Sequence, residues 1–426
     1  MNIKQRLVVL SFLQFFIWGS WLISGGDYFY KTFSDFFHDP NINAGVYVGS
    51  VMSTLGIASL FMPALIGIVA DRWMSAEKLL GICHFVGAIF IFSASFVNNP
   101  NIMFWVILFN SIAYMPTIAL NNSVSYRILS QSDFDVQKTF PPIRVWGTIG
   151  FICAMWFVDL TGFGQSKAQF YVAAISAILM GIYCYTLPSC PPNKKEKKGS
   201  LKESLGFDAF LLLKQEKMAI FFLFSLLLGA ALQITNVWGD GFLRDFGNSK
   251  DFAGSFVVKH RLILLSLSQV SETIFILTIP FFLKRFGIKM VMLLSMFAWV
   301  LRFGLFSIGD PGDGFIFLVM SMIVYGMAFD FFNISGSLFI EKETSSNIRA
   351  SAQGLFMMLT NGIGAILGSI GSGKIIDMYT VNKVREWPTI WLIFAGYALV
   401  LAIVFPLVFK YRHYPEDSLD KLSKGH

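Results

Sequence analysis

The sequence predicts an all-α integral membrane protein, and three observations support that class. Hydrophobic residues make up 55% of the 426 residues, and the mean hydropathy is +0.63. Charged residues make up only 14%, whereas a soluble domain carries roughly 25%. Long apolar segments recur along the whole chain, each near the roughly 20 residues that a helix needs to cross a bilayer.

Twelve segments are apolar and long enough to be transmembrane helices. They cover residues 7–30, 46–70, 79–97, 101–122, 141–163, 168–187, 217–242, 256–281, 287–308, 314–340, 350–376 and 388–410. Two of the joints, at 98–101 and 162–166, are short and rich in turn-forming residues, which indicates that the flanking helices are adjacent.

A polar stretch at 188–216 divides these helices into two sets of six. It carries a run of lysines at 194–198, and we interpret it as a solvated, basic cytoplasmic linker. The sequence therefore predicts an N-terminal half at 1–187, this linker, a C-terminal half at 217–410 and a cytoplasmic tail at 411–426.

The placement of basic residues predicts the topology. An N-terminus in the cytoplasm puts most Lys and Arg outside the helices on the cytoplasmic side, as membrane proteins prefer, so both termini are expected there. The formal charge of +7 then reflects topology and does not indicate nucleic-acid binding. No small-residue cleavage site follows the first apolar run, which favours a retained helix over a signal peptide.

The sequence shows no residue pattern typical of a metal site or of a catalytic nucleophile. The four cysteines have no pairing or metal-ligand spacing, and the five histidines form no cluster. His84 is the histidine well inside an apolar segment, and the sequence gives it no evident partner. We expect no metal and no cofactor, and a membrane-embedded enzyme is the weaker alternative.

Two acids, Glu272 and Asp330, lie within apolar segments. An Asp at the centre of a membrane helix costs roughly 2.5–3.5 kcal/mol on insertion scales, so such residues face a protein interior or a water-filled cavity. Gln269 precedes Glu272 by three positions and Asn333 follows Asp330 by three, so each acid shares a helix face with an amide. Buried acids of this kind mark proton or substrate pathways.

Polar faces also occur on the fifth and seventh predicted helices. Arg144, Thr148 and Phe151 share one face, and Gln233 and Asn236 share another. For any single amide, a hydrogen bond between helices is an equal alternative. Four helices with polar faces together predict a central cavity that offers amides, two acids and a guanidinium.

Aromatic residues accompany these polar groups, namely Tyr325, Phe329, Phe332 and Phe151. Flat rings beside amides suit a solute with a planar base and a hydroxylated sugar, and base–aromatic stacking contributes about 1–3 kcal/mol in nucleic-acid complexes. From the residues alone, a nucleoside and a sugar both remain open.

The joint between the second and third helices has the spacing Gly67, Asp71, Arg72 and, further on, Lys78. With twelve spans in two halves, it resembles the major facilitator superfamily, although the last basic residue is displaced. The resemblance implies an inner gate latch at Gly67, Asp71 and Arg72.

A closer resemblance is carried by five stretches. They are residues 10–21, 140–151, 232–236, 268–273 and 329–337. The chain resembles the bacterial nucleoside:H+ symporter family from its first helix to its twelfth. This implies proton-coupled uptake of purine and pyrimidine nucleosides such as uridine and adenosine, by alternating access, through a monomer in the cytoplasmic membrane. A xanthosine-preferring or sugar/H+ symporter on the same scaffold is the alternative.

The resemblance also implies a substrate site. Its residues are Arg144, Thr148, Phe151, Gln233, Asn236, Gln269, Glu272, Tyr325, Phe329 and Asp330. We expect Glu272 and Asp330 to carry the proton, because apolar surroundings favour the neutral acid. Protonation from outside then permits closure around the substrate, and deprotonation follows its release inside.

Three acids have no place in the family pattern, and one intramembrane cation remains. Asp27, Asp159 and Asp240 lie near outer helix ends, and we expect solvated entrance residues, with Asp240 the one nearest the predicted site. Arg302 lies inside an apolar segment, where we expect a structural partner for a helix end or an acid.

Overall fold

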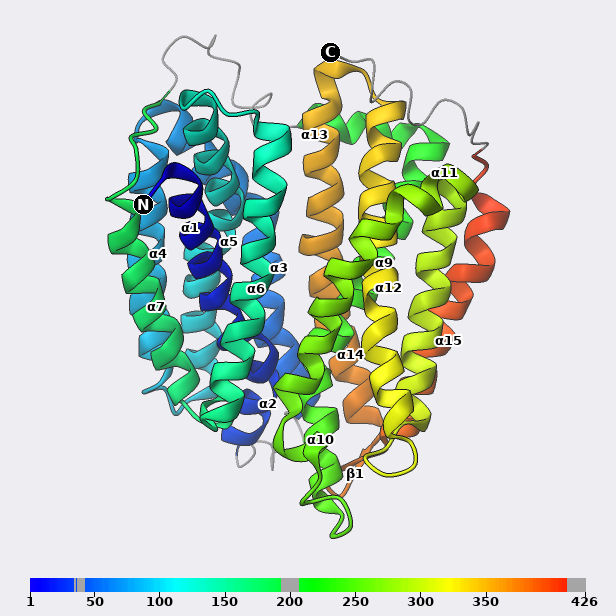
Figure 1. The fold of residues 1–426 in the computed structure, drawn as a ribbon. Coiled ribbons are helices and arrows are strands. Elements are labelled where there is room, and N and C mark those ends of the chain that lie inside the picture. Colours follow the sequence, from blue (N-terminus) through cyan, green and yellow to red (C-terminus); the bar gives the residue numbers. More distant parts are fainter. Residues whose placement is uncertain (34–35, 37–42, 193–206, 412–426) are drawn as a thin grey trace. The chain divides into compact units, whose positions relative to one another are not determined.

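Helices with one small β-hairpin make up the computed structural model of the chain (Figure 1). The structure describes residues 1–33, 36, 43–192 and 207–411, so the lysine run at 194–198 and nearly all of the predicted tail lie outside the described residues. The elements are α1 (Ile3–Gly19), α2 (Leu22–Thr32), α3 (Ala44–Arg72), α4 (Ala76–Ala94), α5 (Pro100–Gln131), α6 (Val136–Leu160), η2 (Phe163–Gln165), α7 (Ala168–Cys184), η3 (Phe207–Lys214), α9 (Glu216–Asp245), η4 (Phe246–Asn248), α10 (Phe256–Lys259), α11 (Arg261–Ile308), α12 (Phe315–Glu343), α13 (Ser346–Met357), η5 (Met358–Gly364), α14 (Ala365–Met378), β1 (Thr380–Val381), β2 (Val384–Arg385) and α15 (Trp387–Val408).

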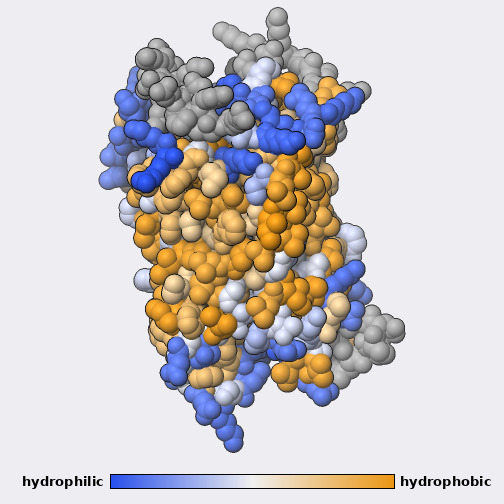
Figure 2. All heavy atoms as spheres, turned by 90° about the vertical axis from the view of Figure 1, so that its right-hand side faces the viewer, coloured by the Kyte–Doolittle hydropathy of each residue, from blue (hydrophilic) through white to orange (hydrophobic). Residues whose placement is uncertain are grey.

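The helices confirm the prediction of an all-α membrane fold. Within the described residues, ten helical segments are long and apolar enough to cross a bilayer, and α7 is a shorter apolar helix. On the face in Figure 2, hydrophobic residues form a broad band with hydrophilic residues at both ends, as a bilayer environment requires. The twelve predicted spans fall on helical residues except at their ends and at breaks in the first span and, at His260, in the eighth. The count of twelve crossings stays a prediction.

Helix α11 contains two of the predicted spans. Its 48 residues correspond to about 72 Å of straight helix at 1.5 Å per residue, more than twice the thickness of a bilayer core of about 30 Å. Gly287 interrupts it with φ 76° and ψ 169°, a backbone conformation that glycine adopts without a Cβ clash. Two helices therefore meet at Gly287, and the short α10 replaces the expected start of the first one.

The chain forms two compact units by the proximity of its Cα atoms. Unit 1 comprises Met1–Leu205, Asn236–Gly241 and Asn361–Lys374, and unit 2 comprises Gly206–Thr235, Phe242–Thr360 and Ile375–His426. Short parts of α9 and of the η5–α14 segment thus group with the first unit. The division into two six-helix halves at 188–216 stays a prediction.

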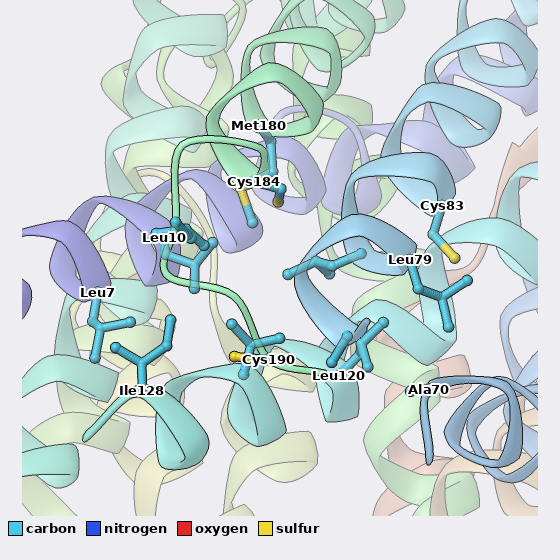
Figure 3. Close-up of a cluster of buried hydrophobic side chains, with 14 of the residues drawn as sticks. Leu7, Leu10, Ala70, Leu79, Cys83, Leu120, Ile128, Met180, Cys184 and Cys190 are labelled. Atoms are coloured by element: carbon cyan, nitrogen blue, oxygen red, sulfur yellow. The ribbon is translucent and has the colours of Figure 1, made fainter. Parts of the chain in front are cut away.

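A hydrophobic cluster in unit 1 joins α1, α4, α5 and α7. Leu7 and Leu10 contribute from α1, and Cys83 contributes from α4 (Figure 3). Cys190, from the segment after α7, is also buried in this cluster, and burial raises the pKa of its thiol to about 11. Its backbone N–H donates to the buried Glu77 carboxylate at 2.8 Å, which fixes this segment against α4.

In unit 2, Asp245 at the end of α9 joins two other segments of the chain. Arg385 on β2 donates to both of its carboxylate oxygens, from Nε at 2.7 Å and from Nη2 at 3.0 Å. The Trp387 indole at the start of α15 donates to Oδ2 at 2.9 Å. The hairpin that presents Arg385 turns through Asn382 and Lys383, both at positive φ.

Replacing Asp245 with Asn is expected to lower the free energy of unfolding by about 3–5 kcal/mol, because it leaves the Arg385 guanidinium buried without its counter-charge. The Arg385 side chain is only 2% exposed, so water cannot substitute. The measurement is the melting temperature of purified protein in detergent. The control is Glu341→Gln, which removes a solvated ion pair to Arg349 and should leave the melting temperature unchanged. Equal melting temperatures for Asp245→Asn and the parent would contradict the prediction.

Candidate functional site

The predicted site residues divide between the two units. Unit 1 holds Arg144, Thr148 and Phe151 on α6 together with Asn236 on α9. Unit 2 holds Gln233 on α9, Gln269 and Glu272 on α11, and Tyr325, Phe329 and Asp330 on α12. The proposed site residues therefore form one group in each unit.

In unit 1, close packing of α1 on α6 places an aromatic ring against Arg144. A Cβ added to Gly150 would meet the Phe12 carbonyl oxygen, and one added to Gly19 would meet the Phe151 carbonyl oxygen, so both glycines are needed for this approach. The Arg144 guanidinium lies over the Phe15 ring at 4.1 Å from its centroid. A guanidinium is planar, stacks on aromatic faces and carries its N–H donors along its edge.

The same packing surrounds Phe151 with aromatic rings. The Trp18 ring meets Phe151 edge-on at 6.2 Å and lies 5.8 Å from the Tyr114 ring on α5. Phe151 is buried, whereas Arg144 and Thr148 are half-buried. Unit 1 thus presents a cation and a hydroxyl beside an aromatic cluster. Trp18 and Tyr114 were not among the residues predicted for the site.

A buried hydrogen-bond network supports this group and was missed from the sequence. The Gln14 amide on α1 donates to the Thr117 hydroxyl on α5 at 2.7 Å, and His84 Nε2 on α4 lies 3.0 Å from Gln14 Oε1. The Tyr114 hydroxyl donates to the Gln14 carbonyl at 2.6 Å. His84 therefore has a partner, contrary to the sequence interpretation, and the network ties three helices together at the level of the aromatic cluster.

In unit 2, α11 and α12 approach so closely that their backbones touch. A Cβ added to Gly326 would meet the Ser271 carbonyl at 2.6 Å and the Glu272 nitrogen at 2.8 Å. The Ser271 hydroxyl donates across the same contact to the Ile323 carbonyl. The absence of a side chain at Gly326 therefore lets Glu272 lie beside the turn of α12 that carries Tyr325.

Two aromatic rings and two acids meet at this contact. The Tyr325 and Phe329 rings are nearly parallel, 6.2 Å apart at an angle of 14°. Asp330 is 3% exposed and its Oδ2 has no hydrogen-bond partner in the described part of the chain. Glu272, Asp330 and the Tyr325 hydroxyl lie within electrostatic range of one another. Glu272 is only half-buried, so it is the more accessible of the two acids.

The amides of the predicted site differ in burial. Gln233 is buried, Asn236 is half-buried, and the Oε1 atom of Gln269 is buried with no hydrogen-bond partner among the described residues. An amide oxygen in that position has its acceptor capacity available for a ligand or a water molecule.

The acids at the outer helix ends differ from the prediction. Asp27 is 6% exposed and Asp240 is 1% exposed, so the expectation of solvated entrance residues is wrong for both. Both belong to unit 1, and Asp159 on α6 is half-buried. Sequence position near a helix end was a poor guide, because neighbouring elements cover these carboxylates.

The predicted latch has a partner that the motif did not name. Asp71, at the end of α3, forms an ion pair with Arg127 near the end of α5, with 2.5 Å between Asp71 Oδ1 and Arg127 Nη2. Arg127 also donates to the Pro191 carbonyl at 3.4 Å, so the latch connects three segments. Gly67 has open space where a Cβ would lie, so packing does not require glycine there in this structure.

No group of three or more His, Cys, Asp or Glu residues with the arrangement of a metal site occurs in the part of the chain that the structure describes.

Comparison with known proteins identifies the family. Residues 1–414 match the family model described as nucleoside H+ symporter. The nucleoside permease NupG of Escherichia coli is 56% identical over 97% of this chain and 97% of its own, and the xanthosine permease of the same organism is 56% identical over 98% of each. A crystal structure of a variant of the nucleoside transporter NupG superposes with a TM-score of 0.91 at 54% identity, covering 96% of this chain and 100% of that one.

These similarities confirm the predicted fold of the major facilitator superfamily and the prediction of a transporter rather than an enzyme. They also confirm the predicted function, proton-coupled nucleoside uptake, at the level of the family. The chain belongs to the nucleoside H+ symporter family of multi-pass membrane proteins.

Proposed function

We propose that the protein carries purine and pyrimidine nucleosides, uridine and adenosine among them, into the cell with protons across the cytoplasmic membrane. The observation that carries the proposal is the contact between α11 and α12, where Glu272 and Asp330 lie beside the stacked Tyr325 and Phe329 rings. The half-buried Phe329 ring, backed by Tyr325, offers a surface for a planar base, and the acids offer acceptors for hydroxyl groups and a site for a proton.

The remaining predicted residues complete the site in this proposal. Arg144, Thr148 and Phe151 contact the substrate, and Gln233, Asn236 and Gln269 supply amides. Alternating access of the two halves exposes these residues to each side in turn. The protein acts as a monomer with both termini in the cytoplasm, and it needs no cofactor because the proton gradient drives uptake.

The test is uptake into proteoliposomes with an imposed pH gradient, acidic outside, and a panel of labelled nucleosides. Uridine and adenosine are expected to accumulate, and a protonophore is expected to abolish accumulation. Downhill flux that is indifferent to the pH gradient would overturn proton coupling by this protein. If unlabelled sugars inhibit uptake of the labelled compounds and unlabelled nucleosides do not, the result favours the sugar/H+ alternative.

A xanthosine preference is the second proposal, and one observation favours it. The xanthosine permease of Escherichia coli is as similar to this chain as the nucleoside permease is, at 56% identity. Competition against labelled uridine separates the two, because a xanthosine-preferring protein is inhibited by xanthosine at lower concentrations than by uridine or adenosine.

A further inference from the structure

Arg302 is a buried cation for which the proposed transport mechanism has no use. It lies in the second part of α11 with 2% of its surface exposed. It forms no ion pair within the described residues, and its Nε has no hydrogen-bond partner there. Burying an unpaired charge is costly, so a long apolar side chain would fill this space at lower cost.

The contacts of Arg302 converge on α12 just before the proposed site. Its Nη1 donates to the Ser321 carbonyl at 2.8 Å. The same nitrogen donates to the hydroxyl of Ser268, in the first part of α11, at 3.4 Å. The Ser321 hydroxyl donates back to the Arg302 carbonyl at 2.9 Å. These bonds fix the guanidinium relative to the turn of α12 that precedes Tyr325.

The guanidinium then lies against the Tyr325 ring. Its carbon atom is 4.5 Å from the Tyr325 ring centroid and 5.1 Å from that of Phe306. The Trp299 ring, one turn earlier on α11, meets Tyr325 edge-on at 6.0 Å, and Phe329 stacks on Tyr325. A desolvated cation on a ring is attracted by the negative face of the π system.

We propose that Arg302 is a positioning residue for nucleoside binding, which holds the buried Tyr325 ring and, through it, the orientation of the half-buried Phe329 ring that faces the substrate. The proposal rests on the proposed function, because it requires Phe329 to contact the substrate. Arg302 acts through Tyr325, since its hydrogen bonds go to serines and backbone and its charge faces aromatic rings. A residue with a merely structural role would affect stability and expression instead of substrate affinity.

The test compares Arg302→Met with Arg302→Lys in proteoliposome uptake of uridine. Arg302→Met is expected to raise KM about tenfold with Vmax within about twofold of the parent, because a loosened ring weakens binding more than it slows conformational change. Its melting temperature in detergent is expected to equal or exceed that of the parent, since a buried charge has been removed. Arg302→Lys keeps a cation near the ring and should restore KM to within about threefold. Arg285→Met, on an exposed arginine of the same helix, is the matched control and should leave KM unchanged.

A Tyr325→Leu variant distinguishes failure of the proposed role of Arg302 from failure of the proposed substrate site. Tyr325→Leu is expected to raise KM, and adding Arg302→Met to it should cause no further rise. An unchanged KM in Tyr325→Leu would refute the proposed site itself. A raised KM in Tyr325→Leu with a parental KM in Arg302→Met would overturn the inference alone. Full additivity of the two changes would also overturn it. Where Arg302→Met yields no folded protein, Arg302→Ala takes its place. A raised KM in Arg302→Ala supports positioning, and a parental KM in Arg302→Ala overturns it.

Discussion

Replacing Asp330 with Asn is expected to abolish accumulation of uridine against its gradient while leaving uridine exchange intact. Asp330 is 3% exposed, and its Oδ2 has no hydrogen-bond partner among the described residues. Acids inside membrane helices mark proton pathways, so we expect loading and release of a proton at Asp330 to accompany changes in its exposure. Asparagine has nearly the same shape but is permanently neutral, so it keeps the packing and removes the proton.

Two assays separate coupling from binding in the Asp330→Asn protein. Accumulation of uridine under an imposed pH gradient is expected to fall at least about tenfold, whereas counterflow exchange without a gradient should stay within about threefold of the parent. Asp313→Asn makes the same chemical change at an exposed position and should affect neither assay. Parental accumulation in Asp330→Asn would remove Asp330 from the proton pathway.

The helical architecture was predictable because its cause is local. Each apolar segment of about 20 residues is sufficient to predict a crossing, and the polar interruptions separate consecutive segments. The joint near Gly287 was predicted from the gap between the apolar segments 256–281 and 287–308. The structure adds that a positive φ at Gly287 forms the kink between the two helices. The hairpin of β1 and β2 was missed, because two-residue strands are too short to show an alternating pattern.

The candidate site was predictable only in part, because spacing along one helix reveals a shared face but not a neighbour from another helix. The pairs Gln269 with Glu272 and Asp330 with Asn333 follow from helical periodicity. The contact of His84 with Gln14 joins residues 70 positions apart, and Asp71 and Arg127 are 56 apart. No local pattern encodes such contacts, and the same limit explains the burial of Asp27 and Asp240, which depends on the elements that cover them.

Replacing Glu272 with Gln is expected to weaken nucleoside binding more than Asp330→Asn does, because the two acids differ in accessibility. Glu272 is half-buried and lies beside Gly326, where α12 leaves no side chain between the helices. A carboxylate there can accept hydrogen bonds from ribose hydroxyls, and bonds to a charged acceptor contribute about 1.5–3 kcal/mol. Glutamine keeps an acceptor oxygen but lacks the charge, so we expect KM for uridine to rise about tenfold.

A substrate that lacks the ribose hydroxyls provides the sharper test of Glu272. If its carboxylate accepts from the ribose hydroxyls, the parent prefers uridine to 2′,3′-dideoxyuridine, and Glu272→Gln reduces that preference by raising KM for uridine alone. Glu216→Gln, at an exposed position at the start of α9, is the control and should keep the parental preference. An equal rise in KM for both compounds would place Glu272 away from the sugar. Because Asp330→Asn is expected to lose accumulation and keep this preference, the two substitutions together assign proton loading to Asp330 and sugar recognition to Glu272.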